Sequence, residues 1–159
     1  MTDIPDLAES PTVARIRSWQ PAVIAELTSS HGELTVAVAR EHLKPLAEFL
    51  ATDPGLAFTY LSDVTGLDRF PIEPRFELNY HLLSLSRREP LRLRVRLQGA
   101  DPVIDSVVPV WPTANWHERE IFDLFGIRFE GHPNLRRMLL PDDWEGYPLR
   151  KDYPVEGPR

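Results

Sequence analysis

The dipeptide His117-Glu118 is the part of this chain that comes closest to a catalytic motif. In HExxH zinc proteases, two histidines four residues apart bind the metal from one helical face, and the glutamate acts as a general base. The position of the second histidine is Ile121 here, so one ligand is missing. Glu118 and Glu120 are two residues apart and cannot share a helical face, which makes them weak as an acid–base pair. We therefore expect neither a metal site nor a catalytic residue in this segment.

The remaining candidates for chemistry also lack a supporting pattern. The eight glycines include no Gly-x-Gly or Walker spacing that could hold a phosphate. Ser62 and Ser84 fall in predicted strands, outside any nucleophile elbow. The sequence has no cysteine, so it offers no thiolates for an iron–sulfur cluster or a Cys-rich zinc site. Four histidines have no ligand spacing, and we expect surface roles for them: His31, His42, His81 and His132.

Length and charge narrow the class of protein further. A chain of 159 residues is one domain with room for a tail or an arm. No apolar run approaches the roughly 20 residues that span a bilayer, and the acidic N-terminus does not resemble a secretory signal. A net charge of −6 argues against nucleic-acid binding, which needs a basic surface. We expect a globular protein of the cytoplasm.

The first half of the chain predicts two helices and three strands. Residues 34–39 alternate at the strand period, and a small, polar, glycine-bearing connection before them is typical of a hairpin. Further on, apolar residues recur at i, i+3, i+4 and i+7, one face of a helix, at Leu43, Leu46, Ala47 and Leu50. We therefore expect a helix over 12–19 with Val13, Ala14 and Ile16 toward the core, a hairpin of strands 22–27 and 34–39, a helix over 41–52 and a strand over 57–67.

A second hairpin, 75–86 with 91–98, is the clearest one. If residues 87–90 form the turn, the numbers of paired residues sum to about 177, an odd value. The even-numbered apolar residues of the first arm then share a face with the odd-numbered apolar residues of the second. The opposite face gathers Glu77, Asn79 and His81 with Arg92, Arg94 and Arg96. We interpret the three arginines as a solvated face paired with Glu77 and acids of neighbouring strands, with a partner contact as the alternative.

The segment 102–113 is rich in proline and predicts either an edge strand or a connection. A helix is expected over 114–125, because Ile121, Leu124 and Phe125 share a face. Arg119 lies four residues before Asp123, which favours an ion pair along the helix. Gly126 is expected to end the helix as its C-terminal cap.

Beyond residue 128 the periodic apolar faces end. Prolines recur every six to eight residues, yet the segment keeps apolar side chains such as Leu139, Trp144 and Leu149. Such a segment lies on its own domain or on another protein, since it has no core of its own. We expect a mobile N-terminal tail (1–11), a domain (12–128) and an extended C-terminal arm (129–159). The fold class is α+β: a two-layer domain with a mostly antiparallel or mixed sheet and helices on one face, followed by the arm.

The helix and the arm carry a run of rare words. Glu-Arg-Glu, two residues, Asp, two apolar or aromatic residues and Gly occur in order from Glu118 to Gly126. Here the sequence resembles the C subunit of NADH:quinone oxidoreductase, the 30-kDa subunit family of respiratory complex I in bacteria, over roughly residues 20 to 154. The motif residues are Glu118, Arg119, Glu120, Asp123, Gly126, Gly131, His132, Pro133, Arg136, Arg137, Trp144, Arg150, Lys151 and Asp152.

The resemblance implies a structural subunit in the peripheral arm of a proton-translocating enzyme. It implies that this chain binds no cofactor, and that FMN, iron–sulfur clusters and quinone are held by other subunits. The implied partners are subunits D, B and I, the first of which helps to form the quinone site. The implied location is the cytoplasmic side of the plasma membrane, reached only through the complex.

Within this family the motif residues would have structural roles. Ion pairs between the acids Glu118, Glu120 and Asp123 and four arginines would lock the helix to the arm: Arg119, Arg128, Arg136 and Arg137. The segment 150–152 (Arg-Lys-Asp) would engage the D subunit. One alternative is the same subunit in a relative of complex I, such as a membrane-bound hydrogenase or a ferredoxin- or F420-dependent dehydrogenase. Another, from a different class, is a stand-alone hydrolase that uses His117 and Glu118.

Overall fold

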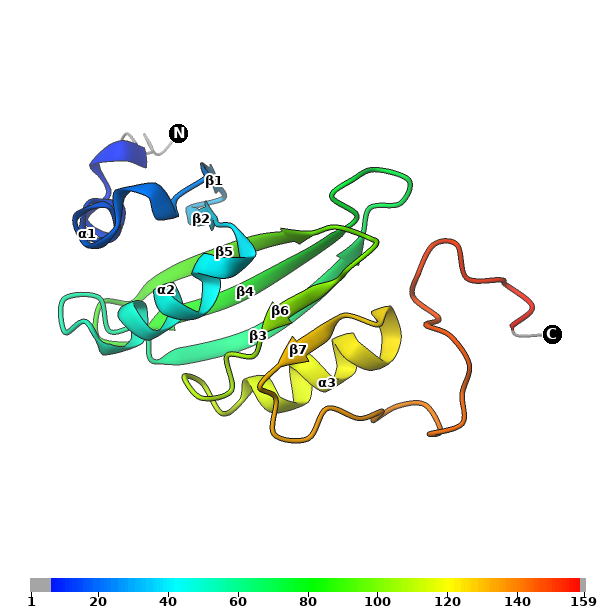
Figure 1. Ribbon diagram of the computed structural model, residues 1–159. Coiled ribbons are helices and arrows are strands. Elements are labelled where there is room, and N and C mark those ends of the chain that lie inside the picture. Colours follow the sequence, from blue (N-terminus) through cyan, green and yellow to red (C-terminus); the bar gives the residue numbers. More distant parts are fainter. Residues whose placement is uncertain (1–6, 158–159) are drawn as a thin grey trace.

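The computed structural model describes residues 7–157 (Figure 1). Of the mobile tail predicted over 1–11, residues 1–6 lie outside the described part, while 7–9 form a 3-10 helix. The elements in chain order are η1 (Leu7–Glu9), α1 (Pro11–Trp19), η2 (Pro21–Val23), β1 (Glu26–Ser30), β2 (Glu33–Ala37), α2 (Arg40–Thr52), β3 (Tyr60–Asp68), β4 (Phe76–Ser84), β5 (Glu89–Leu97), β6 (Val103–Asp105), α3 (Ala114–Phe125) and β7 (Arg128–Glu130).

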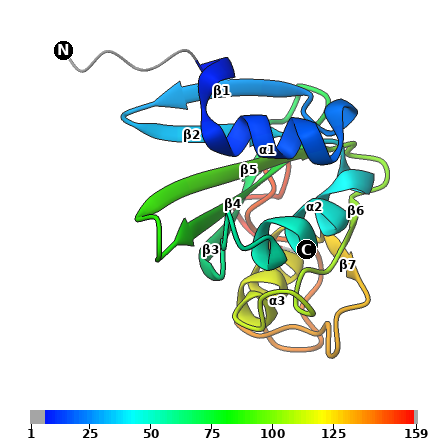
Figure 2. The same cartoon turned by 90° about the vertical axis from the view of Figure 1, so that its left-hand side faces the viewer.

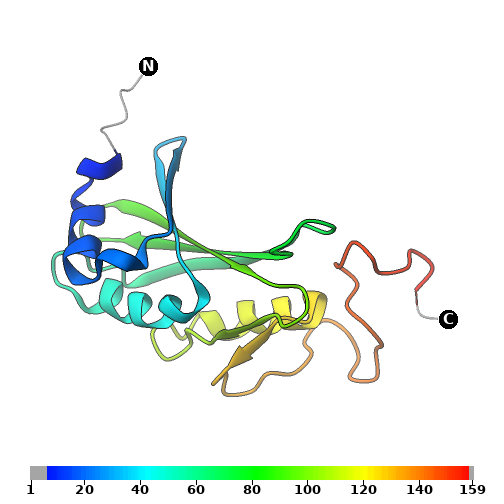
Figure 3. The same ribbon diagram turned by 45° about the horizontal axis from the view of Figure 1, so that its top comes forward.

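Five strands form one mixed sheet in the order β1-β2-β5-β4-β3. All neighbours are antiparallel except β2 and β5, which are parallel and joined through a crossover that contains α2. The helices lie on one side of this sheet, as Figures 2 and 3 show. A second, two-stranded parallel sheet pairs β6 with β7. The predicted α+β fold with a mixed sheet and helices on one face is therefore confirmed.

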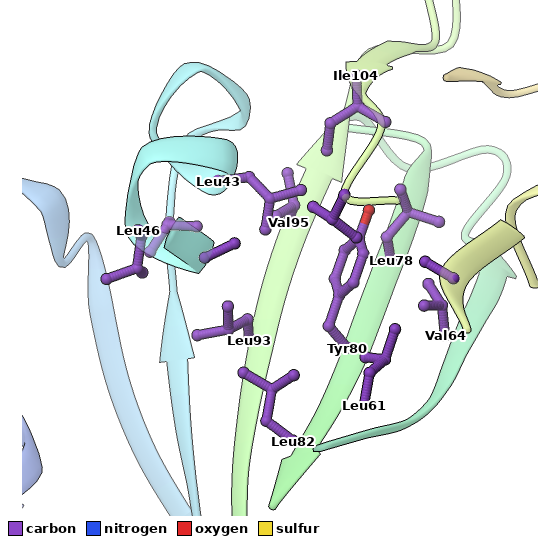
Figure 4. Packing of buried hydrophobic residues seen from close by; sticks show 14 of the residues in the cluster. Leu43, Leu46, Leu61, Val64, Leu78, Tyr80, Leu82, Leu93, Val95 and Ile104 are labelled. Atoms are coloured by element: carbon purple, nitrogen blue, oxygen red, sulfur yellow. The ribbon is translucent and has the colours of Figure 1, made fainter. Parts of the chain in front are cut away.

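The core lies between the sheet and the helices. Tyr80 and Leu93 come from the central strands, and Leu43 and Leu46 come from the predicted apolar face of α2 (Figure 4). These four side chains are fully buried. At the edge strand β3, Gly66 permits close approach of α3, because an added Cβ would lie 3.0 Å from the Phe125 ring.

The β4–β5 hairpin keeps the predicted faces but shifts in register. Paired residue numbers sum to 173, which is odd, so the apolar residues of both strands share the helix side as expected. The turn consists of residues 85–88 rather than 87–90, with Arg88 in the left-handed region at φ 53°. Pro90 is therefore inside β5, opposite Leu83. Its missing N–H is tolerated there because the pairing of β5 with β2 begins only at Leu91.

Three other boundaries differ from the predictions. The first hairpin is present, but β1 begins at Glu26 and includes Thr28-Ser-Ser, which the sequence assigned to the connection. The turn is only His31-Gly32, both at positive φ, as tight two-residue hairpin turns require. Strand β3 begins at Tyr60 rather than 57. In α1, Val13 and Ile16 are buried as predicted, but Ala14 is exposed.

The C-terminal arm has no helix or strand between residues 131 and 157. It follows α3 and then turns toward the end of the sheet that carries the β3–β4 loop (Figure 1). Strand β7 straddles the predicted boundary at 128/129, because Arg128–Glu130 pair with β6. Segment 102–113, left open as an edge strand or a connection, contributes β6 and then a series of turns.

Candidate interface formed by helix α3 and the C-terminal arm

Helix α3 has the predicted bounds and the predicted cap. Gly126 adopts the left-handed conformation at φ +74°, and its N–H bonds to the Phe122 carbonyl at 2.9 Å. A second constraint acts at the same residue. A Cβ at Gly126 would lie 2.5 Å from the Tyr147 ring, so glycine also lets the arm return to the end of the helix.

Asp123 is the main point at which the arm is fastened to α3. Its side chain has no solvent exposure, and Oδ1 accepts a hydrogen bond from the Arg137 guanidinium at 2.8 Å. Its Oδ2 accepts three successive backbone N–H groups at 3.1, 2.7 and 3.0 Å, those of Met138, Leu139 and Leu140. Desolvation alone would raise the pKa of Asp123, but these hydrogen bonds outweigh it and hold the pKa below its ordinary value.

Two arginines complete this fastening. Arg137 also donates to the backbone carbonyls of Asp123 and Gly146, both at 2.9 Å. Arg119 donates to the carbonyls of Arg136 and Arg137 at 3.2 and 3.1 Å, and its guanidinium lies 4.9 Å from the centre of the Trp116 ring. The predicted ion pair of Arg119 with Asp123 is therefore wrong. The arm supplies partners for both residues that sequence spacing could not indicate.

The predicted ion-pair lock holds only in part. The pair of Asp123 with Arg137 is present. Glu118 instead bonds to neutral groups, and Arg128 faces Asp101 at 3.4 Å. Glu120 is half-buried and Arg136 is exposed. The lock therefore rests on one carboxylate and on carbonyl acceptors rather than on a network of charges.

Glu118 points away from the arm and into the core. Its side chain is fully buried, Ser106 Oγ lies 2.6 Å from Oε2, and the Val107 N–H donates to Oε1 at 2.8 Å. Burial raises the pKa of Glu118 to about 7, although both hydrogen bonds act to lower it. The geometry gives this residue neither a metal partner nor an opening to substrate; within residues 7–157, no group of three or more ligating side chains is poised to hold a metal ion.

His132 lies beside Glu118, and the surface role predicted for it is wrong. Its side chain has no exposure, and Nε2 is 4.0 Å from Glu118 Oε2. Nδ1 accepts the Asn134 N–H at 3.0 Å, while Nε2 faces the Asn115 carbonyl at 3.1 Å. The turn at Gly131 folds the ring back under α3, so the arm itself buries this histidine.

A second fastening point joins the end of the arm to the sheet. Arg75 binds Asp68 through two hydrogen bonds of 2.9 and 2.8 Å, and binds Asp152 through two of 2.6 and 3.1 Å. The N–H of Lys151 adds a bond to Asp68 at 2.8 Å. Desolvation would raise the pKa of Asp68, but these hydrogen bonds lower it to about 2. Sequence reasoning missed Asp68 and Arg75, because their partner Asp152 lies 77 residues from Arg75.

The motif residues Arg150, Lys151 and Asp152 were predicted to engage the D subunit. Arg150 donates to the Phe125 carbonyl at 2.7 Å and lies over the rings of Phe76 and Tyr147. Asp152 binds Arg75, whereas Lys151 is exposed. Two of the three side chains thus have bonds within this chain, and their contact with a partner stays a prediction.

The polar face of the sheet carries the predicted arginine stripe in paired form. Arg92 forms an ion pair with Glu33 and donates to His81 Nε2 at 3.0 Å. Arg94 and Arg96 share the Glu77 carboxylate at 3.5 and 3.1 Å. The interpretation as a face paired with Glu77 and a neighbouring acid is confirmed.

The outer surface of α3 and the arm is rich in apolar side chains. Trp116 is 60% exposed, and four residues of the arm are exposed as well: Leu139, Trp144, Leu149 and Val155. The backbone behind them is fastened at Asp123 and Asp68. None of the described helices is long and apolar enough to cross a membrane. Chemically, this arrangement presents a preformed contact surface rather than a reaction centre.

Comparisons with known proteins agree with the residue pattern. The family described as "Respiratory-chain NADH dehydrogenase, 30 Kd subunit" matches residues 36–159. The C subunit of NADH-quinone oxidoreductase from Roseiflexus castenholzii is 45% identical over 148 residues, 92% of this chain and 85% of that protein. The C 2 subunit of the same enzyme from Rhizobium meliloti is 46% identical over 134 residues, 84% of this chain and 73% of that protein.

Solved structures are similar as well. The trypsin-resistant fragment (1–134) of Nqo5 has a TM-score of 0.62 at 35% identity, covering 69% of this chain and 89% of that one. A chain of the membrane-bound sulfane sulfur reductase, an archaeal respiratory membrane complex, has a TM-score of 0.76 at 25% identity, covering 91% and 84%.

The chain belongs to the 30-kDa subunit family of respiratory-chain NADH dehydrogenase. It is a subunit of the peripheral arm of complex I, the NADH-quinone oxidoreductase, and so part of a hetero-oligomeric enzyme. The predicted resemblance is confirmed. The alternative of a subunit from a complex I relative is not favoured, because curated relatives at 41–50% identity carry the complex I name, whereas the archaeal chain is 25% identical.

Proposed function

We propose that this chain is a non-catalytic structural subunit that holds its neighbours in fixed positions within the peripheral arm. The observation that carries the proposal is the fastening of the C-terminal arm by Asp123, which has five hydrogen bonds from the arm, four to its carboxylate and one to its backbone carbonyl. A segment without its own core is thereby held in one shape. Electron tunnelling depends steeply on distance, so rigid placement of the redox subunits is itself a contribution to turnover.

The proposed partners are subunits D, B and I. In this proposal FMN, the iron–sulfur clusters and quinone belong to other subunits, and this chain supplies no catalytic residue. The complex holds it at the cytoplasmic side of the plasma membrane, as a peripheral subunit. The absence of cysteine in all 159 residues supports the proposal, because the usual cluster ligands are then unavailable.

The contact surface of this proposal is the exposed apolar side of α3 and the arm. Tryptophan and arginine dominate the energetic centres of protein interfaces, and here the Trp116 indole is stacked on Arg119. The arm adds Leu139 and Leu149, which are 58% and 51% exposed. Because the backbone beneath these side chains is already ordered, association loses little conformational entropy.

Capture of the complex tests this proposal. A tagged chain replaces the native subunit, and membranes are solubilised and analysed by mass spectrometry and NADH:quinone reductase assay. We expect wild type to co-purify with subunits D, B and I, and the double variant Leu139→Ser, Leu149→Ser to lose at least tenfold of the captured partners. The matched control is Leu85→Ser, 61% exposed in the β4–β5 turn at the far end of the sheet. Missing subunits B and D in the wild-type capture, or unchanged capture by the double variant, would refute the proposal.

A further inference from the structure

Glu118 is a fully buried acid that the structural function does not use. It projects from α3 toward the segment between β6 and α3, where Ser106 and Val107 provide its two hydrogen bonds. Among the described residues, the only basic group within 4.0 Å is the ring of His132. A carboxylate removed from water without a cation is strongly disfavoured, and such groups usually respond by binding a proton.

The hydrogen bonds of His132 define its charge. Nδ1 accepts the Asn134 N–H, so it carries no proton, and Nε2 then carries the proton that faces the Asn115 carbonyl. The ring is therefore neutral in this arrangement. A proton added at Nδ1 would break the bond to Asn134, so His132 does not compensate a charge on Glu118.

The other titratable group facing this site is Tyr80 of β4. Its hydroxyl is buried and has no hydrogen-bond partner among the described residues. Figure 4 shows the ring in the core between the central strands and α3. Burial first and the negative charge of Glu118 second raise the pKa of Tyr80 well above its ordinary value, so it stays neutral. Both neighbours are thus uncharged, and the state of the site is decided at Glu118.

Ser106 makes both states of Glu118 compatible with the same backbone. When Glu118 is ionised, the Ser106 hydroxyl donates to Oε2 across 2.6 Å. When Oε2 carries a proton, the direction of this bond reverses, and Ser106 Oγ accepts from Glu118 and from the Val108 N–H at 3.2 Å. The Val107 N–H remains bonded to Oε1 in either state.

We propose that Glu118 is a reversible proton-binding site buried under the family motif, which takes a proton from solvent and returns it there. Uptake removes an uncompensated charge between α3, β4 and the start of the arm, and so tightens their packing. Release leaves the charge in place and loosens it. The subunit thereby carries a proton-sensitive joint at the root of its contact surface, distinct from the fastening point at Asp123.

The sign of the pH dependence follows from the direction of the shift. The pKa of Glu118 is about 7 in the folded chain against 4.5 ordinarily, so between these values the folded state binds more protons than the unfolded state. Stability then falls as pH rises toward 7 and levels off above it. In thermal unfolding of the full chain, we expect wild type to lose about 4–8 °C between pH 5.5 and 8, relative to Glu118→Gln.

The variant and its control isolate this site. Glu118→Gln keeps the shape and can donate to Ser106 permanently, so its profile should lack this fall. Glu120→Gln removes the same charge from a half-buried position on the same helix and should keep the wild-type slope. Subtraction between variants cancels the titration of the five histidines.

Infrared spectroscopy provides a readout that does not depend on the variant folding. A protonated carboxyl in the core should give a carbonyl band at pH 5.5 that is lost at pH 8.5. If Glu118→Gln fails to fold, Ser106→Ala serves as the second variant and should shift the loss of this band to higher pH. Coincident wild-type and Glu118→Gln profiles, or no pH-dependent carbonyl band, would overturn the proposal.

Discussion

Glu118 and Asp123 are carboxyl groups on the same helix, one and a half turns apart, and neither side chain is exposed. Their surroundings have opposite effects. Asp123 receives three backbone N–H groups and an arginine, and its pKa lies below the ordinary value. Glu118 receives one hydroxyl and one N–H without a cation, and its pKa is raised to about 7. Equal burial therefore produces an ionised group at one position and a proton-binding group at the other.

The difference shows what the arm contributes to this helix. All five donors to Asp123, counting its backbone carbonyl, come from residues 137–140. Without the arm, Asp123 would be a solvated acid at the surface of α3. The partners of Glu118 precede the helix, at Ser106 and Val107, so its environment exists before the arm arrives. One carboxylate holds the arm, and the other belongs to the domain.

The largest effect is expected from Asp123→Asn. The amide keeps one acceptor oxygen but turns an NH₂ group toward donors, which leaves Arg137 and the arm N–H groups without their anion. Breaking one side of a buried pair costs about 3–5 kcal/mol, a fall of roughly 10 °C in thermal midpoint for a chain of this size. Urea unfolding measures the loss, and trypsin should cleave at Arg136 and Arg137 at an increased rate.

The control for that variant is Asp143→Asn, which removes an exposed carboxylate from the same arm. We expect its stability to stay within about 0.5 kcal/mol of wild type. Equal losses for the two variants would show that Asp123 contributes only general charge, and the contrast with Glu118 would lose its basis.

A middle-sized effect is expected in acid, where ionised buried carboxylates behave oppositely to Glu118. The pKa of Asp68 is lowered to about 2, so its stabilisation is present above pH 4 and is lost as pH falls toward 2. The group has 1% side-chain exposure, and the shift corresponds to about 2 kcal/mol. In urea unfolding at pH 4.5 and pH 2, Asp68→Asn should show a smaller acid loss than wild type. A loss of equal size in both proteins would mean that Asp68 is not held ionised by Arg75.

The sequence predicted those features that depend on neighbours along the chain. The bounds of α3, its cap at Gly126 and the faces of the β4–β5 hairpin follow from local periodicity and turn chemistry, and all three are confirmed. The register was wrong by four in the sum because Pro90 suggested a turn, although a gap in the neighbouring strand accommodates it.

The fastening points could not be predicted in the same way. Arg75 reaches Asp152 across 77 residues, and Asp123 selects Arg137 over the nearer Arg119 because the arm returns over the helix. His132 has the sequence context of a surface turn, yet the arm's own path buries it. Each depends on where a segment without periodicity lies, and only the folded chain contains that information. The family resemblance identified the motif residues but not which of them pair.

The smallest effect is expected from Ser106→Ala, which changes the surroundings of Glu118 without changing its charge. A hydrogen bond to the carboxyl is lost in both protonation states, and so is the bond from the Val108 N–H, at a cost of about 1 kcal/mol at pH 5.5. The cost should be greater at pH 8, because a hydroxyl stabilises a carboxylate more than a neutral acid. The wild-type hydrogen bond lowers the pKa of Glu118, so its removal should move the midpoint of the stability profile to higher pH. Thermal unfolding from pH 5.5 to 9 measures both quantities. A midpoint that stays unchanged, or a cost equal at the two pH values, would show that Ser106 only packs beside Glu118, and that burial alone sets the difference between the two acids of α3.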